Sequence, residues 1–170
     1  MLSGIMFLTL ALQAFKTKNM KIAIIGAGNM GGAIAAGLAK GKIVKSGNII
    51  CTARTQKTLD KIKAIDTEIA VTTDNIMAVK EADVVILAVK PWLMENVISG
   101  FREHAAPSGK IFVSVAAGIT LDLLCTWISP ACPSEVCSFR AIPNTAASVL
   151  ASMTFIASAN ADAEQIRLVT

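Results

Sequence analysis

The sequence predicts an α/β domain with a doubly wound, mainly parallel sheet and helices on both faces. Three observations predict it: strand-like and helix-like segments alternate from residue 21 onward, several strand-like segments are unbroken apolar runs, and the chain has 170 residues. Strands buried on both faces are apolar throughout, and alternating strands and helices form right-handed parallel units. A chain of this length makes one domain with a sizeable core.

The expected elements follow one another with short connections. Strands are expected over residues 21–25, 48–53, 68–71, 83–89, 110–116 and 135–142. Helices are expected over residues 29–40, 56–64, 74–80, 92–104 and 121–128. The run DVVILAV at 83–89 is apolar on both faces, which places it at the centre of the sheet. A last helix is expected from residue 160, with Asn160 or Asp162 as its N-cap.

Composition and charge narrow the class of ligand. The net charge is +4, and no basic block is interleaved with aromatic residues, so a nucleic-acid partner is not expected. The cysteines form no C-x-x-C pair and His104 is the only histidine, so no metal site is predicted. Reduced thiols and a cytoplasmic protein are the expected reading of Cys51, Cys125, Cys132 and Cys137.

The two ends of the chain are expected to lie outside the ligand-binding domain. Residues 1–19 are expected to be an extension before a functional start at Met20, with a targeting-like peptide as the alternative. The apolar run at 5–15 is too short to span a bilayer, and no membrane partner is expected. Residues 20–159 are expected to form the ligand-binding domain. Residues 160–170 are expected to begin a truncated helix leading to an absent C-terminal domain.

The stretch Gly26-Ala-Gly28-Asn-Met-Gly31 fits the pattern G-x-G-x-x-G between a strand and a helix. In the Rossmann fold the first glycine permits a tight turn and the second lets the backbone approach a pyrophosphate. The third lets the helix pack against the strand. The alternative is a set of packing glycines that continues through Gly32 and Gly37. The position of the pattern, at the first strand of an alternating series, favours dinucleotide binding.

The end of the second strand indicates which dinucleotide is bound. NAD enzymes usually carry an acidic residue there, but the stretch CTARTQKT at 51–58 has none before Asp60. Arg54 can instead meet a 2′-phosphate by charge-assisted hydrogen bonds, with Thr52, Thr55 and Lys57 nearby. NADP(H) is therefore the expected cofactor, with NAD(H) possible and a solvated loop charge as the alternative.

Four further stretches occur in order after the glycine turn: TTDN (72–75), LAVKPW (87–92), SVAAGI (114–119) and RAIPNT (140–145). Together they resemble the N-terminal domain of pyrroline-5-carboxylate reductases, and the resemblance covers residues 20–170. It implies NADP(H)-dependent reduction of 1-pyrroline-5-carboxylate to L-proline, the last step of proline biosynthesis. It also implies a homodimer or higher homo-oligomer, formed through a helical C-terminal domain.

The resemblance also implies residue roles. Asn75 would contact the adenosine ribose, the A-V-K-P loop would pass beside the nicotinamide, and the A-A-G turn would border nicotinamide and substrate. The candidate cofactor-binding residues are Ile25, Gly26, Ala27, Gly28, Asn29, Met30, Gly31, Ala53, Arg54, Thr55, Asn75, Ala88, Val89, Lys90, Pro91, Ala116, Ala117 and Gly118. Asn144 and Thr145 form the candidate substrate-side loop. No proton donor is assigned.

Each of these loops also has a plain structural reading. Lys90 and Pro91 can end a strand, Asn75 can back a helix cap, and Asn144 can form a turn. The sequence also departs from the family, with Trp92, Ile142 and Ala146 where Gln or His, Met and Pro are usual. Two alternatives for the function stay open. One is a reductase of the 3-hydroxyacid-dehydrogenase or cofactor-420-dependent type, and the other is a fragment that binds NADP(H) without turnover.

Overall fold

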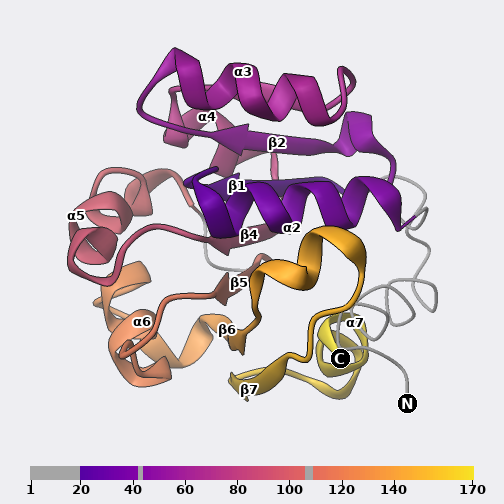
Figure 1. Cartoon of the computed structure of the whole chain (residues 1–170). Helices are drawn as coiled ribbons and strands as arrows, with labels where there is room; N and C mark the ends of the chain where they lie inside the picture. The colour runs from indigo at the N-terminus through magenta and orange to yellow at the C-terminus, as the bar shows by residue number, and fades with distance from the viewer. Residues whose placement is uncertain (1–19, 42–43, 106–108) are drawn as a thin grey trace.

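The structure is a computed structural model that describes residues 20–41, 44–105 and 109–170 (Figure 1). The expectations for residues 1–19 lie outside these ranges. The described residues form one seven-stranded sheet with the strand order β3-β2-β1-β4-β5-β6-β7. Its strands are β1 (Ile22–Ile25), β2 (Ile49–Thr52), β3 (Ala70–Thr72), β4 (Val84–Leu87), β5 (Ile111–Ser114), β6 (Cys137–Ile142) and β7 (Phe155–Ala159).

Every neighbouring pair of strands from β3 to β6 is parallel, and β7 alone runs antiparallel, against β6. The strand β4 is the fourth of the seven, so its predicted central place is confirmed. The sheet is flanked by helices α2 (Asn29–Lys40), α3 (Gln56–Ile65), α4 (Asn75–Glu81), α5 (Met94–Ser99), α6 (Leu121–Ile128) and α7 (Ala163–Val169).

The helices divide between the two faces of the sheet. One cluster of buried residues joins Ile24 and Phe139 of the sheet to Ile34 of α2 and Leu168 of α7. The other joins strand residues such as Phe112 to side chains of α4, α5 and α6. Because alternate residues of each strand point to opposite faces, both faces are buried. The predicted doubly wound α/β fold is confirmed.

The helix bounds follow local signals closely. Helices α2 and α6 begin and end where the sequence predicted them. Helix α4 begins one residue later than expected because Asp74 is its N-cap, and the Asp74 side chain accepts hydrogen bonds from the amides of Ile76 and Met77. At α7 the cap is Asp162, which forms a capping box with Gln165. Asn160, the other candidate, instead donates from Nδ2 to the carbonyls of Pro133 and Val136.

The helix expected over 92–104 is wrong in its extent. Pro91 begins a 3-10 turn, η3 (Pro91–Leu93), the α-helical part is the six residues of α5, and a second 3-10 turn, η4 (Arg102–His104), follows. Pro91 pre-sets the first turn, and Gly100, a poor helix former, caps the end. The break lets Phe101 enter the core while His104 stays exposed.

Two elements had no counterpart in the sequence-based expectation. The chain forms a 3-10 helix, η6 (Thr145–Val149), and then the edge strand β7. Three of the five residues of β7 are exposed, so the segment lacks the buried face by which strands are recognised in a sequence. No helix in the described part of the chain is long and apolar enough to cross a membrane.

Candidate functional site

The carboxyl ends of the parallel strands lie level with one another. Ile25 pairs with Thr52 on one side and with Leu87 on the other. In the same register, Leu87 pairs with Ser114, and Ser114 pairs with Arg140. The predicted loops directly follow these strand ends, so they emerge at one edge of the sheet. Ligands of open α/β sheets bind at this edge, and the candidate residues from 25 to 118 are brought together there.

The first turn of the site is closed by backbone hydrogen bonds. Gly26 has φ of +95°, a conformation that favours glycine. The carbonyl oxygen of Thr52 accepts from the amides of Gly26 at 3.2 Å and Ala27 at 2.7 Å. The Thr52 hydroxyl oxygen lies 3.3 Å from the Gly26 amide as well. Thr52 is buried, so it supports the glycine turn from the core side. Its side chain is therefore not exposed for binding a 2′-phosphate together with Arg54.

The three glycines of the pattern have different surroundings. A Cβ on Gly31 would collide with the Gly26 carbonyl oxygen, and one on Gly26 would lie 2.7 Å from Val89 Cγ1. These two glycines therefore serve close packing between the turn, α2 and the loop after β4. A Cβ on Gly28 would meet no protein atom within 4 Å. Packing within the protein therefore does not require a glycine at this position. Open space beside the backbone is what we expect where a ligand approaches Gly28 from outside.

The amino end of α2 fits a phosphate group. Gly28 is the N-cap, no side chain caps the helix, and no acidic residue lies in its first turn. The first amides of a helix have no partner within it and carry the positive end of its dipole. With open space beside Gly28, these amides of Asn29, Met30 and Gly31 could hold a pyrophosphate, as in other dinucleotide-binding turns.

Arg54, the cation selected from the sequence as a candidate for binding a 2′-phosphate, follows the end of β2. Ala53 is partly buried, whereas Arg54 and Thr55 are exposed. None of the described residues forms a hydrogen bond or an ion pair with the Arg54 guanidinium, which therefore remains available to an anion. The Thr55 hydroxyl lies 3.0 Å from that of Thr58, within the first turn of α3. Asn75 is partly buried in the first turn of α4, where Asp74 performs the capping.

The A-V-K-P loop continues the central strand. The Ala88 amide donates to the Ile25 carbonyl at 2.9 Å, which ties this loop to β1. Lys90 is exposed, and its Nζ lies 5.9 Å from the centre of the Trp92 ring. Ile25 is buried in the core, so only its backbone serves the site. The A-A-G turn after β5 places Ala116 inside and exposes Ala117 and Gly118, the latter with φ of +77°.

The candidate substrate-side loop follows β6. Asn144 is the N-cap of η6: its side chain accepts from the Ala146 amide, and its own amide donates to the Ser152 hydroxyl at 3.0 Å. Lys40 Nζ donates to the Ser148 carbonyl at 2.9 Å, so η6 lies against the carboxyl end of α2. Asn144 and Thr145 are exposed, and they follow β6, two strands away from β4 in the sheet order.

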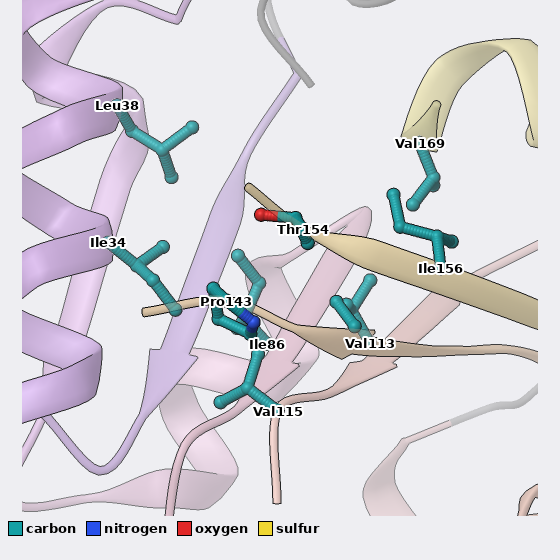
Figure 2. Close-up of a pocket in the computed structure, with 10 residues that line it drawn as sticks. Ile34, Leu38, Ile86, Val113, Val115, Pro143, Thr154, Ile156 and Val169 are labelled. Atoms are coloured by element: carbon teal, nitrogen blue, oxygen red, sulfur yellow. The ribbon is translucent and has the colours of Figure 1, made fainter. Parts of the chain in front are cut away.

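A small apolar cavity of about 40 Å³ lies between α2, the sheet and the segment around β7 (Figure 2). Ile34 and Leu38 of α2 face Val113, Pro143, Thr154 and Ile156 across it. Its lining is almost free of polar groups, so it offers nothing to a dinucleotide.

No cluster of three metal-ligating side chains occurs in the described residues. Burial raises the pKa of the Cys51 thiol, next to Thr52, to about 12. The thiol therefore stays protonated and serves as a small core residue.

Arg140, which the sequence analysis did not select, lies at the carboxyl end of this sheet edge and pairs with Ser114. Its Nε is buried without a hydrogen-bond partner, although it belongs to the quoted RAIPNT stretch. A cationic residue inside an otherwise neutral strand was the available signal.

The family model described as NADP oxidoreductase, coenzyme F420-dependent, matches residues 21–118. The chain belongs to this family. The match extends from β1 to the A-A-G turn and therefore includes the glycine turn, Arg54, Asn75 and the A-V-K-P loop. The predicted oxidoreductase class and the predicted cofactor, NADP(H), are confirmed at the level of this NADP oxidoreductase family.

Individual relatives confirm the predicted resemblance. The chain is 36% identical over 140 residues to a pyrroline-5-carboxylate reductase of Methanosarcina acetivorans, covering 82% of this chain and 50% of that protein. The solved pyrroline-5-carboxylate reductase of Coxiella burnetii aligns with a TM-score of 0.79 at 31% identity, over 89% of this chain and 54% of the other. The Plasmodium falciparum enzyme, solved with NADP bound, shares the fold with a TM-score of 0.77 at 24% identity. The chain thus spans about half the length of the relatives it matches.

Proposed function

We propose that this chain is the cofactor-binding part of an NADP-dependent reductase that converts 1-pyrroline-5-carboxylate to L-proline. The observation that carries the proposal is the convergence of the glycine turn, A-V-K-P loop and A-A-G turn at one sheet edge. These loops belong to a chain 36% identical over 140 residues to a pyrroline-5-carboxylate reductase. That similarity is longer than the family model's match at 21–118, which favours the imine reductase over a cofactor-420-dependent enzyme.

The chain's residues would bind and orient the cofactor. The first amides of α2 would hold the pyrophosphate, the Arg54 guanidinium the 2′-phosphate, and Asn75 the adenosine ribose. The loops 88–91 and 116–118 would flank the nicotinamide, which supplies a hydride to the C=N carbon when the cofactor is bound. Asn144 and Thr145 would border the substrate. His104 lies on η4, beyond α5 and away from these loops, so no proton donor is assigned.

The proposal also covers the organisation of the longer protein. Residues 20–159 would form the dinucleotide-binding domain, and residues 160–170 would lead to the helical C-terminal domain that the resemblance implies. In that protein, a cytoplasmic homodimer or higher homo-oligomer, the second domain would complete the substrate pocket. The 170-residue chain alone is therefore expected to bind NADPH and to reduce the imine little or not at all.

Binding and turnover test the two parts of this proposal separately. The purified chain is titrated with NADPH while the nucleotide's fluorescence is followed, and NADPH oxidation is then measured with 1-pyrroline-5-carboxylate. We expect saturable binding and negligible oxidation. Turnover comparable with that of a complete reductase would contradict the division of the site. A folded chain that binds no NADPH would contradict the cofactor-binding role itself.

A further inference from the structure

A second cavity, of about 230 Å³, lies at the edge of the sheet opposite the candidate functional site. It is bounded by the amino ends of β4 and β5, by Met20 just before β1, and by helix α7. Ile22 pairs with Val84, and Val84 pairs with Ile111, so the three strands begin level with one another. The candidate cofactor loops follow the carboxyl ends of the strands, so this cavity is separate from the proposed cofactor site.

The cavity combines apolar side chains with acidic ones. Its buried apolar side chains are those of Val84, Ile111 and Leu168. Its acidic side chains, which are exposed, are those of Asp83, Asp162 and Glu164. A complementary occupant would therefore bring an apolar side chain and positive charge together.

The three carboxylates form no ion pair within the described part of the chain. Asp83 Oδ2 accepts the backbone amide of Lys21, and Asp162 caps α7, so backbone amides are their partners. The neighbouring lysines are engaged elsewhere: Lys21 Nζ lies 2.7 Å from a carboxylate oxygen of α4, and Lys110 Nζ donates to two backbone carbonyls. Neither lysine lines the cavity. The negative charge of the cavity is thus open to a further cation.

The chain enters β1 beside this cavity. Met20 lines it and also packs against the core. The sequence just before Met20 is Phe15-Lys16-Thr17-Lys18-Asn19, which lies outside the described residues. An extended chain spans at most about 3.6 Å per residue, so Lys18 lies within about 7 Å of Met20 and Phe15 within about 18 Å. A segment tethered so closely binds at a high effective concentration.

We propose that residues 15–18 dock in this cavity, with Phe15 against the apolar side chains and Lys16 and Lys18 beside the carboxylates. Alternate residues of an extended segment point to opposite sides. Phe15 therefore faces one way and the two lysines the other, which matches the division of the cavity. The inference goes beyond the proposed function and does not depend on it. It gives the segment before Met20 a supporting role at the edge of the sheet away from the cofactor.

Carbodiimide cross-linking of the 170-residue chain, mapped by mass spectrometry, tests the contact directly. The reagent joins a lysine amine to a nearby carboxylate through an amide bond. We expect links from Lys16 or Lys18 to the carboxylates of the cavity. Mixing ¹⁵N-labelled with unlabelled chains distinguishes links within one chain from links between two. The proposal is overturned if no such link forms, if the lysines link mainly to carboxylates elsewhere, or if every link joins two chains.

Thermal unfolding tests whether the contact contributes to stability. The double variant Lys16→Glu/Lys18→Glu should lower the melting temperature by about 2–4 °C. Adding Glu164→Lys should recover part of that loss, because opposite charges then face each other again. The control Lys45→Glu/Lys61→Glu makes the same change in net charge at two exposed lysines outside the cavity and should shift the temperature less.

Equal losses in the two double variants, or no recovery with Glu164→Lys, would overturn the proposal. The Kd for NADPH should be the same in all of these variants, because the cavity lies at the opposite edge from the glycine turn. If the wild type binds no NADPH, the proposed function fails, while the cross-links and the melting temperatures still decide this inference.

Discussion

The loops after β1, β2 and β4 and the segment after β6 extend from strands of the same sheet but differ in their stabilising contacts and in their exposed surface. The first group is fixed by the backbone: Thr52 accepts the amides of Gly26 and Ala27, and Ala88 donates to Ile25. The segment after β6 exposes several large apolar side chains, among them Met153 (70% exposed) and Phe155 (69% exposed), whereas the loop after β4 leads to one, Trp92 (76% exposed). The difference teaches that the loops around the glycine turn are closed by hydrogen bonds among the described residues, whereas the segment after β6 presents apolar surface suited to further protein contacts.

The rigidity of the glycine turn is tested by Gly31→Ala. The added Cβ would collide with the Gly26 carbonyl, and the nearby Ala88 Cβ, at 3.2 Å, closes the other side. Overpacking of this kind costs about 2–3 kcal/mol of unfolding free energy, measured by urea denaturation. Gly47→Ala, where a Cβ meets nothing within 4 Å, is the control. Equal stability of the two variants would mean that the turn yields easily and is not preorganised.

Gly28→Ala separates ligand binding from packing. The new methyl group meets no protein atom, so the stability should change by less than about 1 kcal/mol. It would occupy the space next to the helix amides, and losing one hydrogen bond to a charged phosphate costs about 1.5–3 kcal/mol. We therefore expect the Kd for NADPH to rise at least about tenfold, as measured by fluorescence titration. An unchanged Kd would place the pyrophosphate elsewhere.

The cofactor side could be predicted from the sequence because its signals are local. The tight turn needs glycine at Gly26, the close packing needs it at Gly31, and α2 begins where the pattern ends. The structure of the segment after β6 could not be predicted in the same way, because it depends on contacts between residues that are distant in the sequence. Strand β7 forms because it pairs with β6 at the edge of the sheet. The buried Nε of Arg140 is unusual only because it has no hydrogen-bond partner among the described residues. Neither fact is present in a short window of sequence.

The buried thiols give the core a pH dependence. Burial raises the pKa of Cys51 to about 12, and burial with nearby Asp162 and Cys125 raises that of Cys137 to about 11. Unfolded thiols ionise near about pH 8.5, so the unfolded state loses these protons first. The stability present below about pH 8.5 should therefore fall as the pH rises toward the folded values.

Between about pH 8 and 9.5 we expect a loss of about 1 kcal/mol of unfolding free energy from Cys51 and a similar loss from Cys137, measured by urea denaturation. Cys51→Ala should reduce the slope of stability with pH, and Cys132→Ala, at an exposed cysteine, is the matched control. The same slope in both variants would show that other groups titrate in this range.

The smallest effect on stability is expected at the exposed segment. Phe155→Ser removes an apolar side chain that the fold scarcely buries, so the unfolding free energy should change by less than about 0.5 kcal/mol. Its consequence should instead appear in sedimentation velocity, as reduced association at high protein concentration. A large loss of stability would show that Phe155 supports the fold, and the contrast between the two regions would then disappear.

The most direct test of the cofactor site is a side-by-side titration of the chain with NADPH and NADH, repeated on Arg54→Asp. Charge-assisted hydrogen bonds to a 2′-phosphate are worth about 1.5–3 kcal/mol. The wild type should therefore bind NADPH about tenfold or more tightly than NADH, and the variant should lose that preference without losing NADH. Equal binding of the two nucleotides by the wild type would contradict the role of Arg54. Failure of the folded chain to bind either nucleotide would contradict a cofactor site complete within these 170 residues.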